Sequence, residues 1–153
     1  MLLTAGLFVN AMQQIRCEFC HEYIDAELCS SHRAQHLMLR SDGQQTDYAT
    51  LPKEEREQGD IADIPRVYLH DRCRIETGMP DDIIRSYLAN PYLYFSDQTF
   101  CAGCNKHVPF RECKWTETDE NLQVYMNRLR EGKPEHRPGF LTRILLSVVK
   151  RFN

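Results

Sequence analysis

Three stretches of the chain place apolar residues at the three- and four-residue spacing of an amphipathic helix. The first follows Pro80, whose ring suits the first turn of a helix, and stops before Pro91. The second follows the cap-forming residues 116–118 and reaches about Arg130, and the third occupies residues 140–153. The predicted buried faces are Ile83, Ile84, Tyr87 and Leu88; Leu122, Tyr125, Met126 and Leu129; and Leu141, Ile144, Leu145, Val148, Val149 and Phe152.

Shorter runs rich in β-branched and aromatic residues predict strands at residues 66–70 and 108–115. Residues 41–65 are polar, contain Gly and Pro, and show little apolar periodicity, so they are interpreted as a linker. A second linker is predicted at residues 132–139. The pattern therefore predicts an α+β protein made of small units.

Cysteine and histidine spacing predicts a metal site near the start of the chain. Cys17 and Cys20 form a C-x2-C pair, and His32 and His36 follow after eleven residues. Residues four apart on a helix lie on one face, so both imidazoles can point toward the cysteine pair. Zn2+ accepts two thiolates and two imidazoles tetrahedrally, and four protein ligands leave no position for a catalytic water. The site is therefore predicted to be structural.

The two histidines belong to a helix predicted over about residues 26–39, with Asp25 as its N-cap. Ile24 and Leu28 are expected to form its small core. Cys29 is an alternative ligand, although a small core residue is the simpler interpretation.

This spacing resembles that of the C2H2 zinc-finger family, whose DNA-reading members usually have twelve residues between the pairs. With eleven, the segment is more similar to the ubiquitin-binding zinc fingers of eukaryotic repair proteins. The resemblance covers about twenty residues and supports Cys17, Cys20, His32 and His36 as ligands.

A second set of four donors is predicted from His70 and Cys73, an H-x2-C pair, and from Cys101 and Cys104, a C-x2-C pair. The predicted helix after Pro80 lies between the two pairs. A glycine inside the second pair is expected to let backbone amides approach the sulfurs.

Two other residues compete for a place in the second set. Cys113 in place of His70 would make an all-cysteine site, and His107 lies three residues after Cys104. His70 is preferred because the paired geometry needs no distant fourth ligand. Thiol redox chemistry at the C-x2-C pairs is disfavoured, since it requires a helix N-terminus in a βαβ context that the pattern lacks.

Composition and charge restrict the class of protein. The chain has 153 residues, a net charge of −3 and seven cysteines. The odd cysteine count argues against a disulfide framework and favours a reducing cytoplasm. The apolar start has no basic region typical of a secretory signal, and Met12 is a possible alternative start. No run approaches the ~20 apolar residues that cross a bilayer.

The expected organisation is a ββα-like finger over residues 12–40, the linker over 41–65, and a second zinc-binding domain over 66–131. The linker over 132–139 and an amphipathic helix over 140–153 follow. The blocks that begin DGQQTDY, GMPDDII and FCAGCNK resemble small uncharacterised double-zinc proteins of bacteria, over about residues 17–135.

The predicted function is that of a protein-interaction adaptor with two zinc ions and no catalytic activity. The amphipathic helix is expected to dock on its own protein, on a second copy or on a partner, and peripheral membrane contact is an alternative. Nucleic-acid binding through the finger is the alternative function, because Arg16, Arg33 and Arg40 could form a basic edge. The negative net charge and two acids disfavour it, since the helix positions that would face a groove are Asp25, Glu27, Leu28 and Ser31.

Overall fold

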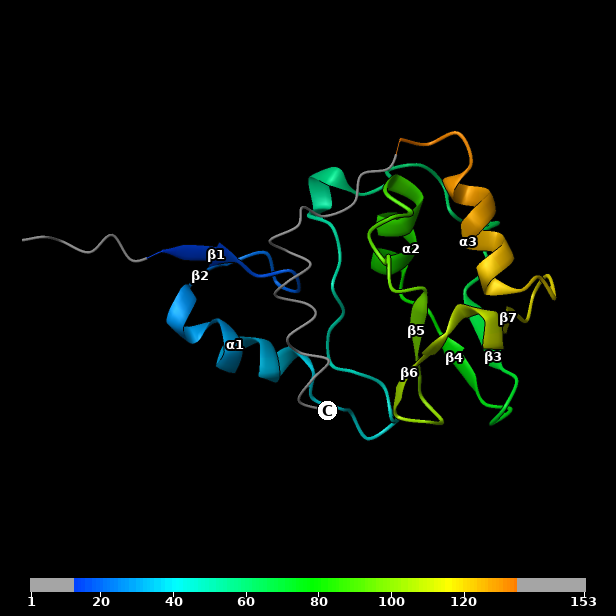
Figure 1. The fold of residues 1–153 in the computed structure, drawn as a ribbon, viewed down its shortest axis with the longest axis horizontal. Helices are drawn as coiled ribbons and strands as arrows, with labels where there is room; N and C mark the ends of the chain where they lie inside the picture. The colour runs from blue at the N-terminus through cyan, green and yellow to red at the C-terminus, as the bar shows by residue number, and fades with distance from the viewer. Residues whose placement is uncertain (1–12, 135–153) are drawn as a thin grey trace, which may run out of the picture.

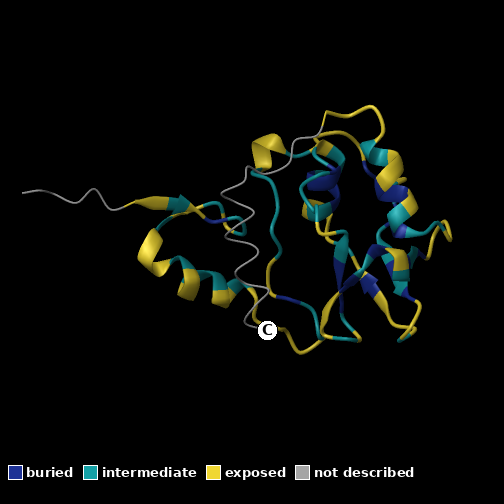
Figure 2. Cartoon of the chain, viewed as in Figure 1, coloured by how far each residue is buried: buried dark blue, intermediate teal, exposed yellow. Residues whose placement is uncertain are grey.

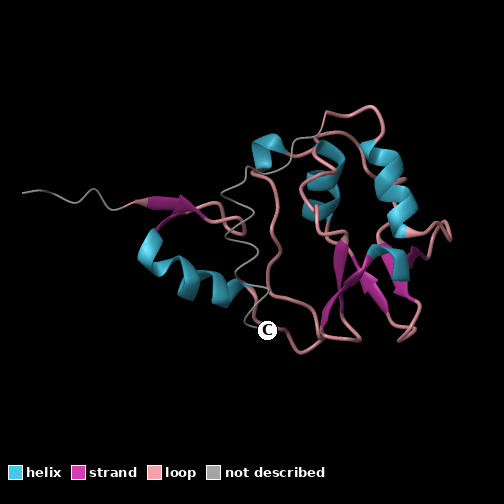
Figure 3. Ribbon diagram, in the orientation of Figure 1, coloured by secondary structure: helices cyan, strands magenta, loops and turns pink. Residues whose placement is uncertain are grey.

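The computed structural model describes residues 13–134. The possible start at Met12, most of the predicted second linker and the predicted helix at residues 140–153 lie outside this range. The described chain is a mixture of short strands and helices, as expected for an α+β protein. Figure 3 shows these elements by type. Within residues 13–134 no helix has the length and apolar character needed to span a membrane.

The first unit of the structure is a small hairpin followed by a helix. Strand β1 (Gln14–Arg16) pairs antiparallel with β2 (Tyr23–Asp25). A single 3-10 turn, η1 (Ala26–Leu28), leads into α1 (Cys29–His36). Figure 1 shows this ββα unit beside the larger remainder of the chain.

The finger helix differs from the prediction in length, cap and core. Regular α-helix covers α1 alone and ends at His36, because Leu39 then forms an antiparallel bridge with Gln45. Asp25 precedes the 3-10 turn, but its side chain makes no capping hydrogen bond. Leu28 is 56% exposed, so the expected Ile24–Leu28 core is wrong, although Ile24 is half-buried.

The second unit contains two small antiparallel sheets and two helices. Strand β3 lies between β4 and β7 in one sheet, and β5 pairs with β6 in the other. The helices α2 and α3 lie on the same side of these strands in Figure 1. The bounds are β3 Val67–His70, β4 Glu76–Gly78, α2 Asp81–Ala89, β5 Gln98–Cys101, β6 Lys106–Pro109, β7 Cys113–Trp115 and α3 Leu122–Arg130.

The single strand predicted at residues 108–115 is wrong. A 3-10 turn, η3 (Phe110–Glu112), divides this run into β6 and β7, which belong to different sheets. The predicted start of the next helix at residues 116–118 is also too early. Asn121 is the N-cap of α3, and its side chain accepts a hydrogen bond from the backbone N–H of Gln123.

The hydrophobic core lies in the second unit, where Figure 2 shows the buried segments of the strands and of the two helices. Ile84 and Tyr87 of α2 and Leu122, Tyr125 and Met126 of α3 are buried, which confirms the two predicted faces. Trp115 lies between these elements and packs edge-on against two tyrosines, Tyr68 and Tyr125.

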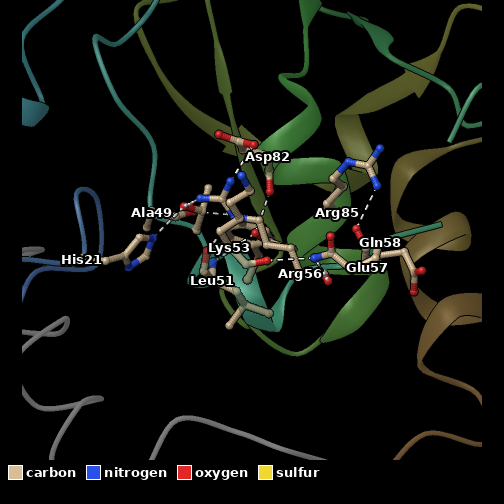
Figure 4. Close-up of polar contacts among 12 residues, drawn as sticks. His21, Ala49, Leu51, Lys53, Arg56, Glu57, Gln58, Asp82 and Arg85 are labelled. Atoms are coloured by element: carbon tan, nitrogen blue, oxygen red, sulfur yellow. Dashed lines mark hydrogen bonds and ion pairs between the residues drawn. The ribbon is translucent and has the colours of Figure 1, made fainter. Parts of the chain in front are cut away.

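Residues 41–65 contain one short helical turn, η2 (Lys53–Glu55), and make side-chain contacts with both units. Ile61 is buried in the core of the second unit. Arg56 donates to the backbone oxygen of Leu51 and forms an ion pair of 2.6 Å with Asp82 of α2 (Figure 4). Arg85 of α2 donates to the Glu57 carbonyl. Side-chain contacts therefore fix the path of this segment despite its polar composition.

Candidate metal centres

Three short turns carry the cysteine pairs and the H-x2-C pair, and all three have one backbone geometry. His21, Arg74 and Asn105 each follow the second ligand candidate of a pair directly. Each has a positive φ, between 52° and 64°. Such φ values are uncommon outside glycine, so the shared position identifies a common turn.

Hydrogen bonds repeat in these turns as well. The backbone N–H of His21 donates to the Cys17 carbonyl, and that of Arg74 donates to the His70 carbonyl, each at 2.9 Å. The backbone N–H of Cys17 donates to the Glu22 carbonyl, and that of His70 donates to the Ile75 carbonyl. Cys101 lies opposite Lys106, five positions later, in the β5–β6 register. Each turn therefore presents two side chains, three residues apart, toward one point.

A fourth turn of this geometry contains none of the predicted ligands. Trp115 N donates to the Glu120 carbonyl, Asp119 N donates to the Trp115 carbonyl, and Asp119 has a φ of 59°. Trp115 and Thr118 occupy the places that cysteine or histidine holds in the other three turns. The turn can therefore form without metal ligands, and only the cysteine and histidine donors distinguish the three turns that serve the two candidate sites.

The first cluster joins the turn of the β1–β2 hairpin to α1. The candidate donor atoms of Cys17, Cys20, His32 and His36 all lie within 4.8 Å of one another and could hold a metal ion. Cys20 Sγ lies 3.3 Å from His32 Nε2, which in turn lies 3.0 Å from His36 Nε2. The ring nitrogens that approach the cluster are therefore Nε2 in both histidines.

Two neighbours hold the His36 ring. Its Nδ1 lies 2.8 Å from Oδ2 of Asp47, a residue of the segment expected to be a linker. The Phe19 ring stacks on the His36 ring with centroids 5.0 Å apart. A carboxylate on the outer nitrogen of a metal-binding histidine fixes the ring orientation and increases its basicity. Asp47 is in the position for this role.

The second cluster joins the β3–β4 turn to the β5–β6 turn. Its candidate atoms, from His70, Cys73, Cys101 and Cys104, also lie within 4.8 Å of one another. His70 Nδ1 lies 3.2 Å from the sulfur of Cys73, 3.5 Å from that of Cys101 and 3.4 Å from that of Cys104. His70 and Cys101 are buried, so this cluster forms part of the core of the second unit.

A carboxylate also faces the outer nitrogen of His70. Oε2 of Glu112 lies 3.5 Å from His70 Nε2 and 3.0 Å from Nε of Arg72. Glu112 belongs to η3, the turn that divides the expected strand. Glu112 therefore stands to His70 as Asp47 stands to His36. The ring nitrogen that faces the cluster is Nδ1 in His70 and Nε2 in His36.

The thiols of the second cluster have unequal acidities. Burial raises the pKa of the Cys73 thiol, but hydrogen bonds to its sulfur from the Ile75 backbone N–H and from His70 outweigh burial and lower the pKa to about 7. Burial and the neighbouring thiols of Cys73 and Cys101 raise the pKa of Cys104 to about 11. At neutral pH Cys73 is therefore the readier of the two to supply a thiolate, the form that binds metal.

The alternative ligands lie outside both clusters. Cys29 is half-buried at the start of α1, and Cys113 is fully buried in β7, where burial raises the pKa of its thiol to about 12. The His107 ring packs edge-on against Phe100. The arrangement therefore brings together the two sets of four side chains that the spacing predicts.

Gly103 has a steric role that the spacing did not predict. A Cβ atom added at this residue would lie 2.6 Å from both Cβ and Cγ1 of Ile75. Gly103 belongs to one turn of the second cluster, and Ile75 follows the other turn. The absence of a side chain at Gly103 thus allows the two turns to approach each other.

Sequence reasoning missed Asp47 and Glu112. Neither belongs to a recognisable spacing with its histidine, because the separations are 11 and 42 residues. A polar segment rich in acids surrounds Asp47, and that composition by itself indicates solvent exposure. No signal in the sequence singles out either residue.

Comparison of the chain with protein-family models, with curated proteins and with solved structures gives no match. The similarity of the first cluster to C2H2 zinc fingers therefore rests on the spacing of its cysteines and histidines and on its ββα arrangement. What the chain shows is an α+β protein with two Cys/His clusters that could each bind a metal ion.

Proposed function

We propose that the protein binds two zinc ions in closed, structural sites and acts as a protein-binding adaptor without catalytic activity. The observation that carries this proposal is the convergence of four soft or borderline donors in each cluster. Thiolate and imidazole are the ligands that Zn2+ prefers in structural sites.

The distances between donor atoms fit this ion. Bonds of about 2.3 Å to sulfur and 2.0 Å to nitrogen place tetrahedral donors about 3.3 to 3.8 Å apart. Four donor pairs of the second cluster are separated by 3.2 to 3.5 Å and two pairs of the first by 3.0 and 3.3 Å, at or slightly below this range, and all donor atoms of each cluster lie within 4.8 Å of one another. Four protein donors complete the usual coordination of structural zinc, so neither site offers a position for a reacting water.

The surface of the finger supports binding to protein. Leu37, Met38 and Leu39 follow α1 directly and are 36%, 63% and 49% exposed. Adjacent exposed apolar side chains of this kind are typical of contact surfaces between proteins.

The alternative, nucleic-acid binding, is less well supported. The three arginines that could form a basic edge on the finger each pair with an acid. Arg33 lies 2.6 Å from Glu18, Arg40 lies 3.0 Å from Asp42, and Arg16 lies 3.5 Å from Glu54. Their charges are thus compensated before any phosphate approaches.

Native mass spectrometry of the full chain tests the metal part of the proposal, because it counts metal ions and subunits together. Two zinc ions per chain are expected, and one or none would contradict the proposal. Replacement of zinc by Co2+ tests whether all four coordination positions are filled by protein ligands. If they are, added azide cannot bind the metal and the visible spectrum should not change. A spectral response to azide would indicate an open coordination position.

Binding experiments distinguish the two partner classes. We expect that a gel shift at physiological salt detects no sequence-selective binding to duplex DNA. Nanomolar selective binding would favour the alternative. For a protein partner, Met38→Asp should weaken capture, whereas Gln35→Asp on the exposed side of α1 is the matched control.

A further inference from the structure

A large apolar cleft lies between the two metal-binding units. Its volume is about 800 Å3, which is within the range of sites that bind ligands. Its walls come from three parts of the chain. Phe19 and Leu37 belong to the first unit, Tyr48 to the connecting segment, and Met79, Leu93 and Phe95 to the second unit.

The described chain ends close to this cleft. Pro134 lines a small adjacent hollow together with Leu51 and Glu55. Leu51 directly follows Thr50, which lines the large cleft. The ammonium group of Lys133 donates to the Leu88 carbonyl at 2.7 Å and so fixes the chain at this point.

We propose that residues 140–153 dock into this cleft as an amphipathic helix of the same chain. Their apolar arc comprises Leu141, Ile144, Leu145, Val148, Val149 and Phe152. A 14-residue helix is about 21 Å long. The five residues 135–139 can span about 17 Å when extended, enough to carry such a helix from the hollow beside Leu51 to the cleft.

Charge also favours this occupant. Residues 135–153 contain four basic side chains and one acidic side chain, whereas the remainder of the chain contains fifteen basic and twenty-one acidic ones. At the cleft itself Glu18 pairs with Arg33, and the adjacent hollow is lined by both Glu55 and Lys133, so the complementarity lies in the net charges of the two segments. The basic tail is therefore attracted to the acidic remainder of the chain as a whole, while the face with Arg143 and Lys150 stays directed away from the cleft.

The short connection through residues 135–139 favours the chain's own tail over a second copy or another protein as the occupant of the cleft. A helix joined by five residues has a high effective concentration near the cleft, of millimolar order for short flexible linkers. A second copy or a free partner at micromolar concentration would compete at a disadvantage. The docking goes beyond the proposed adaptor function. It covers the apolar cleft, so an external protein that binds there would have to displace the tail.

Photo-cross-linking in the full chain tests the docking. A benzophenone amino acid replaces Val148, on the apolar arc, and the products are mapped by mass spectrometry at submicromolar protein. We expect cross-links within one chain, to residues 48–50 and 93–96. Placing the same probe at Ser147, on the opposite face, is the matched control and should give few of these products.

Every other pattern overturns the proposal. Cross-links between two chains that increase with protein concentration would indicate self-association. Cross-links to lipid in the presence of anionic vesicles, or the absence of cross-links, would also contradict it. As a second measurement, Ile144→Asp should increase hydrogen exchange at residues 48–50 and 93–96, whereas Ser147→Asp should not. The zinc content of each variant shows whether its fold is intact.

Discussion

The Nδ1 atom of His36 lies 2.8 Å from Oδ2 of Asp47, and this contact joins the finger helix to the polar segment that follows it. The contact leaves Nε2 of the same ring directed toward His32. Asp47 thus orients a candidate ligand without being one itself.

Replacement of Asp47 by Asn should weaken metal binding at the first site. The amide has no charge to balance a ring that carries part of the charge of the metal, and loss of such partners typically lowers affinity about 10- to 100-fold. Competition with a chromophoric chelator measures the zinc affinity of each site. Asp42→Asn is the control, because Asp42 pairs with Arg40 in the same segment and contacts neither cluster. Equal affinities for the two variants would show that Asp47 has no role in binding.

Replacement of Cys101 by Ser should remove one zinc ion and leave the other bound. Cys101 is fully buried in the second cluster, so its loss should also destabilise the surrounding core. Native mass spectrometry counts the ions, and hydrogen exchange locates the unfolding within residues 66–130. Loss of both ions would show that the two units fold together, through contacts such as that of His21 with Thr50.

Cys113→Ser is the matched control for that experiment. Cys113 is as buried as Cys101 and belongs to the same core, but it lies outside the cluster. A hydroxyl at this place should cost about 1 to 3 kcal/mol in the free energy of unfolding. Both zinc ions should remain bound, and retention of one ion would make Cys113 a ligand.

Gly103→Ala should destabilise the second unit. The added methyl group would lie 2.6 Å from Ile75 Cβ, an atom fixed to the backbone, so the two turns must move apart. Overpacking of this kind typically costs about 1 to 3 kcal/mol. Urea unfolding at saturating zinc measures the change. Gly78→Ala is the control, since a Cβ there meets nothing within 4 Å, and an equal loss in both variants would contradict the steric explanation.

Leu122→Ala should reduce the free energy of unfolding by about 2 to 5 kcal/mol, because it opens a cavity at the start of α3. Leu122 is 1% exposed, whereas Val124 on the same helix is 57% exposed. Val124→Ala should therefore change the stability by less than about 0.5 kcal/mol. Chemical denaturation of both variants makes the comparison. Similar losses in the two variants would contradict the explanation by burial of Leu122.

The spacing of residues over one or two turns of the chain determined the ligand pairs and the buried faces of the helices. Donors three or four residues apart share one turn or one helix face, so the pairs Cys17–Cys20 and His32–His36 could be recognised without a structure. The buried faces of α2 and α3 followed from the same periodicity. The convergence of two distant pairs into each cluster was an inference from donor chemistry, and the structure places those side chains together.

Only the tertiary structure decided which side chains contact the outer nitrogens of the two ligand histidines and which predicted core residues stay exposed. Glu112 reaches His70 because η3 turns the chain between two sheets, and Asp47 reaches His36 because the connecting segment folds back on the finger. Leu28 is 56% exposed although it lies at helical spacing from His32, which periodicity alone did not reveal. These contacts depend on the path of the whole chain, which periodicity and spacing over a few residues do not specify.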